Sequence, residues 1–300
     1  MRPQPNPYRT YLISRLCYIL RCMKGGSRPQ GYTIVEVMIF LAVTGGLFVA
    51  IVATFSGQQG KAQFVQAARD MESKMQDIIN DVSTGYYNAN PANNFRCREV
   101  AGLPQVTASA SDTQGTNDEC IFIGRVAHFA VSGSGGTNYN VYNVVGLRQA
   151  PGSNPRREAG GFSDAHPTAI MGGSLDNIVE EEQIPAGLSV ASMTYSTGGA
   201  PTPIAAIGFF STFGSYQSGG LQSNSLGVNV VPLSAGGADS TPVQVQTAIQ
   251  GLNNTSAQNP RGGVAICMNS VTSRQHAVLT IGGNDRQLTT DLAIRNNSCP

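Results

Sequence analysis

The chain has 300 residues, of which only 12% are charged, while glycine occupies 35 positions and tryptophan none. This length can bury a hydrophobic core, as one large domain or two modest ones. The low share of charged residues argues against a nucleic-acid-binding domain, a coiled coil and a charge-rich disordered chain. A hydrophobic share of 41% excludes a polytopic membrane protein but permits a single span.

The net charge of +1 conceals an uneven distribution along the chain. Six of the 19 basic residues precede the first acidic residue, Glu36, so residues 1–31 carry a charge of +6 before the amino terminus is counted. The remaining 13 basic and 18 acidic residues give residues 32–300 a net charge of −5. A basic segment in front of a mildly acidic body is typical of a membrane-topology signal.

Residues 32–55 form an apolar stretch with a single charge. As a helix this stretch would be about 36 Å long, at roughly 1.5 Å per residue, which is enough to cross a bilayer. The basic residues before it predict that its N-terminal end stays in the cytoplasm and that the following chain lies outside. The stretch is too long for the core of a secretory signal peptide, and no A-x-A cleavage site follows it cleanly.

Glu36 is the one charge of this stretch, at its fifth position. A carboxylate near the membrane core costs on the order of 2.5–3.5 kcal/mol on the insertion scale, so a plain uncleaved anchor has no use for it. A signal-anchored surface protein that does not assemble, in which Gly31 and Glu36 are accidental, is the alternative interpretation.

Residues 31–37, Gly-Tyr-Thr-Ile-Val-Glu-Val, resemble the processing site of type IV prepilins, where a small residue precedes an aromatic-led apolar helix with glutamate at its fifth position. The resemblance covers residues 27–79. It implies that a membrane peptidase removes residues 1–31 by cutting after Gly31, and that Tyr32 becomes the N-methylated amino terminus. Tyr32 replaces the more usual phenylalanine, and the leader is long for the short-leader class, so the subclass stays open.

The same resemblance implies a role for Glu36. Cleaved pilin helices bundle in an apolar core, where an unpaired amine and an unpaired carboxylate would each be costly. Glu36 of one subunit is therefore expected to neutralise the Tyr32 amine of a neighbour and to set the register of assembly. Gly45 and Gly46 each cost about 1 kcal/mol in a helix interior, and they fit either close helix packing or local melting during assembly.

Residues 56–84 are polar overall but carry an apolar stripe at helical spacing. The stripe consists of Phe64, Ala68, Met71, Met75, Ile78 and Val82. No proline interrupts residues 32–90, so one helix of about 50 residues is predicted. Its first half is expected to be the transmembrane or filament-core part, and its second half is expected to pack on a globular head.

From residue 85 to residue 300 the composition shifts to Gly, Ser, Asn and Thr, with short β-rich stretches between turns. Strands are predicted at residues 120–131, 139–147, 205–213, 227–231, 243–249, 263–268, 277–281 and 289–294. Residues 132–138 are predicted to be a hairpin connection, and residues 152–182, 221–227 and 253–263 to be surface loops. The expected fold is α+β, with a long N-terminal helix packed on an antiparallel β-sheet in a pilin-like head.

The cysteines fit an exported head. Four of them lie beyond the membrane segment, namely Cys97, Cys120, Cys267 and Cys299, while Cys17 and Cys22 fall in the leader. Four cysteines allow three connectivities, and the residues alone do not choose among them. The resemblance favours Cys97–Cys120 and Cys267–Cys299, because many pilins tie the C-terminal tail back to the last strands. Free buried thiols are the alternative.

The sequence contains no nucleophile elbow, P-loop or H-E-x-x-H motif. His128, His166 and His276 are far apart, and His128 and His276 are predicted to be surface or hydrogen-bonded core residues. The run 180–182 (Glu-Glu-Glu) is predicted to be a solvated loop, and residues 282–285 a plain turn. The expectation is a protein that is not an enzyme, with no catalytic residue, no cofactor and no metal.

The resemblance implies a structural subunit of a type IV pilus (a fimbrium) or a pilus-like filament, made as a single-pass precursor in the cytoplasmic membrane and then polymerised on the cell surface. Its partners would be the prepilin peptidase and N-methyltransferase, other pilin subunits, and a host or surface ligand. The large head slightly favours a minor or adhesive pilin over a major one, and a secretion pseudopilin is a further alternative. Twitching motility, adhesion, secretion and DNA uptake stay open, although the acidic body argues against DNA capture.

Overall fold

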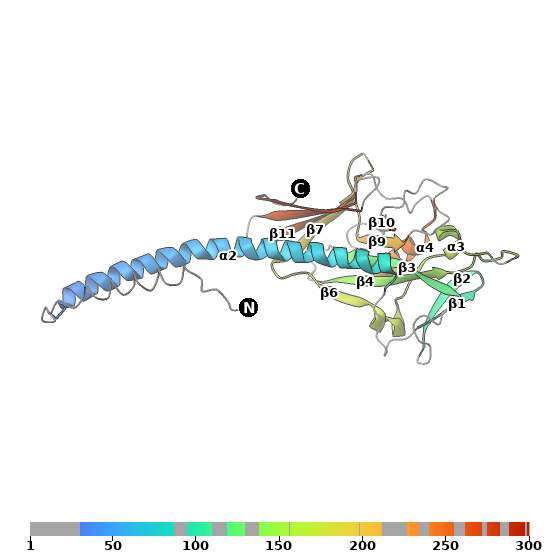
Figure 1. The fold of residues 1–300 in the computed structure, drawn as a ribbon, viewed down its shortest axis with the longest axis horizontal. Helices are drawn as coiled ribbons and strands as arrows, with labels where there is room; N and C mark the ends of the chain where they lie inside the picture. The colour runs from blue at the N-terminus through green and yellow to red at the C-terminus, as the bar shows by residue number, and fades with distance from the viewer. Residues whose placement is uncertain are drawn as a thin grey trace, which may run out of the picture. The chain divides into compact units, whose positions relative to one another are not determined.

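A computed structural model of the chain describes residues 31–86, 95–109, 119–129, 138–155, 157–197, 199–211, 227–233, 240–254, 262–271, 275–282, 288–297 and 299. The chain divides into two units, Met1–Ser56 and Gly57–Pro300. Helix α2 (Ile34–Thr84) provides the described helix of the first unit and also contributes to the second (Figure 1).

Helix α2 ends where glycine permits a left-handed backbone. Gly85 has a φ of 69°, and its N–H donates to the carbonyl of Val82 at 3.2 Å. The next N–H, of Tyr86, donates to the carbonyl of Asp81 at 2.8 Å. These two bonds form a Schellman motif, which satisfies carbonyl groups that the end of a helix otherwise leaves without partners.

The described part of the second unit contains two larger antiparallel sheets and a hairpin. The first sheet has the order β10-β9-β3-β4-β5, and β6 also pairs with β4. Its strands are β3 (Cys120–Phe129), β4 (Asn138–Leu147), β5 (Thr168–Ala169), β6 (Glu180–Gln183), β9 (Ala206–Ser211) and β10 (Val228–Leu233). The second sheet has the order β13-β12-β11-β7-β8. Its strands are β7 (Leu188–Tyr195), β8 (Thr202–Pro203), β11 (Val264–Ser270), β12 (His276–Ile281) and β13 (Thr290–Arg295).

The remaining elements are short. Strands β1 (Phe95–Val100) and β2 (Leu103–Ala108) form the hairpin. Three short helices lie in the described parts of the connections, namely α3 (Phe162–Ala165), the 3-10 helix η1 (Gly173–Ile178) and α4 (Pro242–Gln250). All strand pairings in the two sheets and the hairpin are antiparallel. The mixed helix and antiparallel-sheet architecture agrees with the predicted α+β class.

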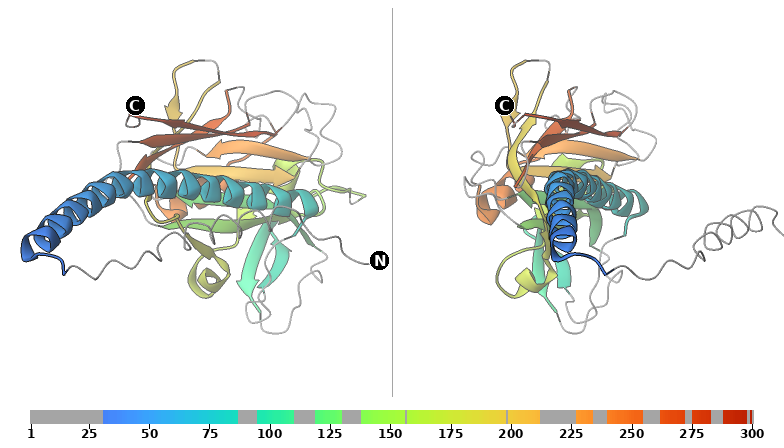
Figure 2. Two further views of the ribbon diagram at one scale, coloured as in Figure 1. Left: turned by 60° about the vertical axis from the view of Figure 1, so that its left-hand side comes forward. Right: turned by 90° about the vertical axis from the view of Figure 1, so that its left-hand side faces the viewer.

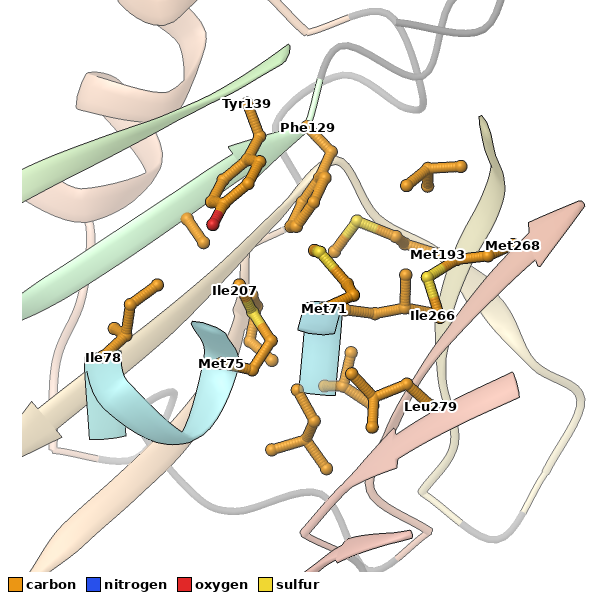
Figure 3. Close-up of a cluster of buried hydrophobic side chains, with 14 of the residues drawn as sticks. Met71, Met75, Ile78, Phe129, Tyr139, Met193, Ile207, Ile266, Met268 and Leu279 are labelled. Atoms are coloured by element: carbon orange, nitrogen blue, oxygen red, sulfur yellow. The ribbon is translucent and has the colours of Figure 1, made fainter. Parts of the chain in front are cut away.

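The main hydrophobic core lies where α2 meets both sheets (Figure 2). Met71 and Met75 are fully buried on α2, and residues of both sheets belong to the same cluster. Figure 3 shows these methionines facing Phe129 and Tyr139 of the first sheet and Met193, Ile266 and Leu279 of the second. Unbranched methionine side chains suit this position, because they adapt to the uneven space between two sheets.

A second cluster lies on the opposite face of the first sheet. Val245 and Ile249 of α4 pack there with Phe162 of α3 and with strand residues such as Val126 and Phe210. The rings of Phe162 and Phe210 meet edge to face, with centroids 5.3 Å apart. The first sheet is therefore covered on both faces, which explains why β3, β4 and β9 are buried along most of their length.

The prediction of a strand at residues 243–249 is wrong. Val243 and Val245 alternate with glutamines as in a strand, but the structure has helix α4 here. Thr241 and Gln244 form a reciprocal capping box, and Pro242 occupies the first helical turn, where its missing N–H costs nothing. The buried residues Val245 and Ile249 are four positions apart and therefore share one helical face.

Several further predictions need correction. Residues 152–182 were expected to be a surface loop, yet they contain α3, β5, η1 and the start of β6, and Phe162, Ile170 and Leu175 are buried. The glutamate run 180–182 lies in strand β6 and not in a solvated loop. Strands β1, β2, β7 and β8 were not predicted either, and two larger sheets replace the single expected one. Most of the predicted connections at 132–138, 221–227 and 253–263 lie outside the described residues.

Candidate functional site

The expected processing and assembly residues lie at the start of α2. Tyr32 is 79% exposed, and Gly31 and Glu36 are exposed as well. No heavy atom lies within 4 Å of the position that a Cβ on Gly31 would take. The backbone at the expected cleavage position is therefore open to another molecule in the described structure.

Glu36 also has a local structural role that the sequence analysis missed. Its N–H donates to the Thr33 hydroxyl at 3.3 Å, and the N–H of Val37 donates to the Thr33 carbonyl at 3.2 Å. Thr33 and Glu36 thus have the spacing of a capping box, and Glu36 is an acidic residue in the first turn, where the helix dipole favours negative charge. The spacing T-x-x-E in the sequence was the signal for this role.

After this start the helix is apolar around its whole circumference. The apolar segment, Ile34–Val52, has a mean hydropathy of 2.4, and none of it is buried. Its 19 residues span about 28 Å at roughly 1.5 Å per residue, so it is long and apolar enough to cross a membrane. A membrane anchor, a signal sequence and a helix of a larger bundle all share these properties. Each of them requires other molecules to cover the apolar surface.

The polar and small residues inside the apolar segment are compatible with an apolar environment. The hydroxyl of Thr44 donates to the Phe40 carbonyl at 2.8 Å, so it needs no water. Gly45 and Gly46 follow directly, and no heavy atom lies within 4 Å of the positions that their Cβ atoms would take. Other helices could approach the backbone closely at these two glycines.

The second part of α2 is fixed to the head by buried residues at helical spacing. The buried segment, residues 64–82, buries Phe64, Ala67, Ala68, Met71, Met75, Ile78, Ile79 and Val82, each with no more than 5% of its surface exposed. All six residues of the predicted apolar stripe belong to this set, so the prediction that the stripe faces the head core is confirmed.

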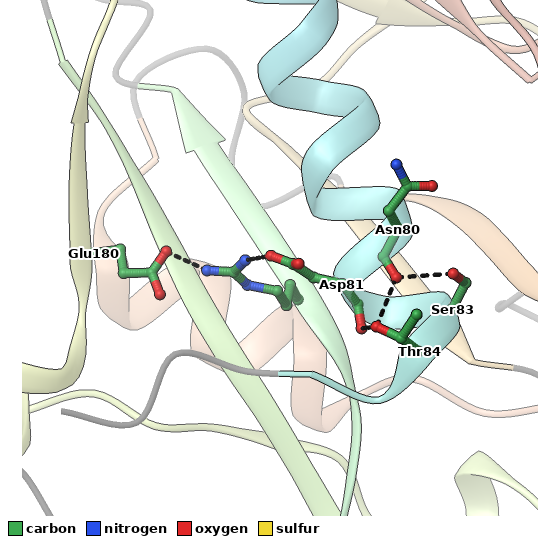
Figure 4. A network of polar contacts seen from close by, with 6 residues as sticks. Asn80, Asp81, Ser83, Thr84 and Glu180 are labelled. Atoms are coloured by element: carbon green, nitrogen blue, oxygen red, sulfur yellow. Dashed lines mark hydrogen bonds and ion pairs between the residues drawn. The ribbon is translucent and has the colours of Figure 1, made fainter. Parts of the chain in front are cut away.

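An ion cluster fastens the C-terminal end of α2 to the first sheet (Figure 4). The Arg125 side chain on β3 is only 4% exposed, and its guanidinium donates to Asp81 of α2 at 2.6 Å and also to Glu180 of β6. Burial raises the pKa of the Asp81 carboxyl and that of the Glu180 carboxyl, and the nearby Arg125 charge opposes the shift. One guanidinium thus serves two partly buried carboxyl groups from different elements.

Further polar contacts fasten α2 to both sheets. The Lys74 ammonium lies 2.6 Å from a Glu182 carboxylate oxygen on β6. On the other sheet, Thr290 of β13 accepts a hydrogen bond from Gln76 at 2.7 Å and donates one to Glu72 at 3.2 Å. No local sequence pattern predicts these contacts, because the paired residues lie between 108 and 218 positions apart.

The four cysteines of the head form two disulfides, Cys97–Cys120 and Cys267–Cys299. These are the two pairs that the pilin resemblance favours. The first bridge joins β1 to the start of β3 inside a small apolar cluster. The second joins β11 to the C-terminal tail, where the N–H of Cys299 donates to Asn269 at 3.1 Å.

The three histidines have structural roles. His128 is 4% exposed and hydrogen-bonds the Ser240 carbonyl at 3.0 Å, while His276 is 2% exposed and hydrogen-bonds the carbonyl of Asn297. Of the two predicted alternatives, a surface residue or a hydrogen-bonded core residue, the structure shows the core residue for both. His166 caps α3 in a left-handed conformation. Within the described ranges no group of three His, Cys, Asp or Glu side chains could hold a metal ion.

Comparison of the chain with protein-family models, with curated proteins and with solved structures found no match.

Proposed function

We propose that the protein is a structural subunit of a type IV pilus or a pilus-like filament. In this proposal the chain is made as a single-pass membrane precursor, cleaved after Gly31, methylated at the Tyr32 amine, and polymerised through α2. The observation that carries the proposal is the division of α2 into an apolar segment with Glu36 in its first turn and a buried segment that belongs to the core of a disulfide-bonded head.

The apolar segment supports a membrane precursor and a helical filament core. Its large side chains between Ile34 and Val52 are 43–77% exposed, far more apolar surface than a free soluble protein presents. Lipid would cover this surface before assembly, and helices of other subunits would cover it afterwards. The second unit supports a location outside the cytoplasm, because two disulfides fit an oxidising compartment.

Glu36 supports assembly in preference to simple anchoring. Once the leader is removed, Tyr32 would carry a free amine four positions before the Glu36 carboxylate. In an apolar bundle each charge needs a partner, and the Glu36 of one subunit can neutralise the Tyr32 amine of the next. The proposed partners are therefore the prepilin peptidase and N-methyltransferase, the membrane, and other pilin subunits. The proposal assigns the protein no reaction and no cofactor, and it favours a minor or adhesive subunit.

The capping geometry favours a second candidate, a signal-anchored surface protein that does not assemble. Glu36 would then serve only the start of α2, together with Thr33. The two candidates differ in what they require of residue 36. Capping accepts either glutamate or glutamine at this position, whereas pairing with an amine requires the negative charge.

Glu36→Gln therefore separates the candidates. The filament proposal predicts that the variant is processed normally but is lost from the sheared cell-surface fraction, at least tenfold relative to the native chain. Thr33→Ala is the matched control, because it removes the capping hydroxyl and keeps the charge, and it should still assemble. Normal incorporation of Glu36→Gln would overturn the pairing. Gly31→Leu tests processing separately, since it should leave residues 1–31 attached.

A further inference from the structure

Strand β6 distributes its three glutamates over the two faces of the first sheet. Glu180 and Glu182 lie on the face that carries α2, where they pair with Arg125 and Lys74. Because side chains alternate along a strand, Glu181 lies on the opposite face. Its described polar contact is with Asn138, whose side-chain amide donates to Glu181 Oε1 at 2.5 Å. Among the described residues, therefore, only Glu181 of the three glutamates lacks a cationic partner.

Glu181 borders a cavity of about 600 Å³ on this opposite face. The cavity lies between β4, β6 and the N-terminal turn of α4, and its volume is within the range of small-molecule sites. Asn140 is the direct cross-strand neighbour of Glu181 and borders the cavity with it. Met171, Val179 and Pro242 provide apolar wall.

A chain of hydrogen bonds orients the polar groups of the cavity. The Nε2–H of His128 donates to the Ser240 carbonyl at 3.0 Å, because a carbonyl can only accept. Burial lowers the pKa of His128, which favours the neutral ring at neutral pH; with the proton on Nε2, the Nδ1 of the neutral ring accepts from the Tyr142 hydroxyl at 3.2 Å. The Tyr142 oxygen in turn accepts from the Asn140 amide at 3.3 Å. The side-chain oxygen of Asn140 is the acceptor of the same amide group.

The side chains of the cavity consequently offer acceptors. Glu181 contributes a carboxylate and Asn140 an amide oxygen, while the Tyr142 proton is directed to His128. The Gln246 amide is used by the backbone of Ala169, from which it accepts at 3.0 Å. The first turn of α4 offers little to an anion, because Pro242 has no N–H and the N–H of Gln244 donates to Thr241.

We infer that this cavity binds an aliphatic primary ammonium group, with the ammonium on Glu181 and Asn140 and the methylene stem against Met171, Val179 and Pro242. An ammonium carries three donors and no acceptor, which complements the acceptors of the cavity, and its hydrogen bond to a carboxylate is charge-assisted. A lysine side chain of a partner protein and a free aliphatic diamine both carry this group. The inference does not rest on the filament proposal.

The test measures the dissociation constants of small probes for the detergent-solubilised full chain by saturation-transfer NMR. Nα-acetyl-lysine methylamide and 1,5-diaminopentane are expected to bind. The norleucine analogue, which has the stem without the ammonium, should bind at least tenfold more weakly. The probe with the lower dissociation constant indicates whether the natural source is a lysine side chain or a free diamine, and binding of either supports the inference.

Two variants locate the binding in this cavity. Glu181→Gln changes an exposed side chain and keeps its shape, and it should weaken binding of the lysine probe at least tenfold. Glu158→Gln, at an exposed glutamate outside the cavity wall, is the matched control and should leave binding unchanged. Val243→Lys places an ammonium on a wall residue that is 73% exposed, and it should also weaken binding at least tenfold.

Three results would overturn the inference. The norleucine analogue could bind as tightly as the lysine probe, which would make the cavity merely apolar. Glu181→Gln could leave the dissociation constant unchanged, which would place binding elsewhere. Inorganic phosphate could bind more tightly than either amine and bind Glu181→Gln more tightly still, which would assign the cavity to anions at the N-terminus of α4.

Discussion

The two parts of α2 have similar helical backbones and opposite environments. Met38 in the apolar segment is 66% exposed, whereas Met71 and Met75 in the buried segment are fully buried. The apolar segment is hydrophobic on all sides, while the buried segment confines its hydrophobic residues to one side. The distribution of apolar residues around a helix, more than their number, therefore indicates whether the rest of the same chain buries that helix.

The contrast has a direct consequence for stability. Changes in the buried segment or in its polar contacts should destabilise the head, whereas equivalent changes in the apolar segment should act on membrane insertion or assembly. The free energy of unfolding of the detergent-solubilised full chain, followed by urea titration and tyrosine near-UV circular dichroism, measures the first kind of effect.

Removing the central cation of the ion cluster should have the largest effect. Arg125→Met leaves the Asp81 and Glu180 carboxyl groups partly buried without their cation, and it should lower the free energy of unfolding by about 3–5 kcal/mol. Arg157→Met is the matched control. Its side chain is 61% exposed beside Asp164, so its loss should cost less than about 1 kcal/mol. Equal effects of the two variants would contradict a stabilising role of the ion cluster.

A methionine exchange tests the two segments directly. Met71→Ala leaves a cavity between the two sheets and should lower the free energy of unfolding by about 2–5 kcal/mol. Met38→Ala removes the same atoms from an exposed position and should leave this free energy unchanged. A comparable loss in both variants would show that the apolar segment also contributes to the stability of the head.

The disulfides should contribute somewhat less. Replacing both Cys267 and Cys299 by serine releases a loop with a sequence separation of 32 and should lower the free energy of unfolding by about 2–4 kcal/mol. The same double replacement at Cys97 and Cys120, with a separation of 23, should have a slightly smaller effect by loop entropy. A change under about 0.5 kcal/mol in both pairs would mean that neither bridge constrains the unfolded chain.

The smallest predicted effect concerns pH. The pKa values of Asp81 and Glu180 are raised in the folded state, so folding favours their protonated forms. Their stabilising contribution is present below the unfolded values of about 4 and is lost as the pH rises through the folded values. The double variant Asp81→Asn, Glu180→Gln should therefore lose less stability than the native chain between pH 4 and pH 7. A steeper loss in the variant would reverse the assigned sign.

Local patterns predicted much of the fold. The stripe from Phe64 to Val82 identified the buried segment, and β3, β4, β9, β11, β12 and β13 lie where short β-rich stretches between turns predicted strands. Helix α4 was missed because Val243 and Val245 alternate like a strand, although Thr241 and Pro242 are typical of a helix start. The alternation of apolar residues predicts a strand there, whereas the capping residues predict a helix. The residues form a helix, because the capping box satisfies its first turn and because Val245 and Ile249 pack on one face.

The parts that could not be predicted depend on contacts between distant residues. Arg125 is 44 positions from Asp81 and 55 from Glu180, and no local pattern relates them. Glu181 faces the cavity only because β6 pairs with β4 in a particular register, which places Asn140 opposite it. At the proposed N-terminal processing and assembly site the opposite holds, since Gly31, Tyr32 and Glu36 are close in sequence and a local pattern was enough to suggest them; this site stays a prediction.

The most direct test of the proposed function is the mass of the N-terminal peptide of the protein recovered from a sheared cell-surface fraction. The filament proposal predicts a peptide that begins at Tyr32 and carries a methylated amine. A chain that retains Gly31 and the residues before it, and that stays in the membrane fraction, would contradict the filament proposal.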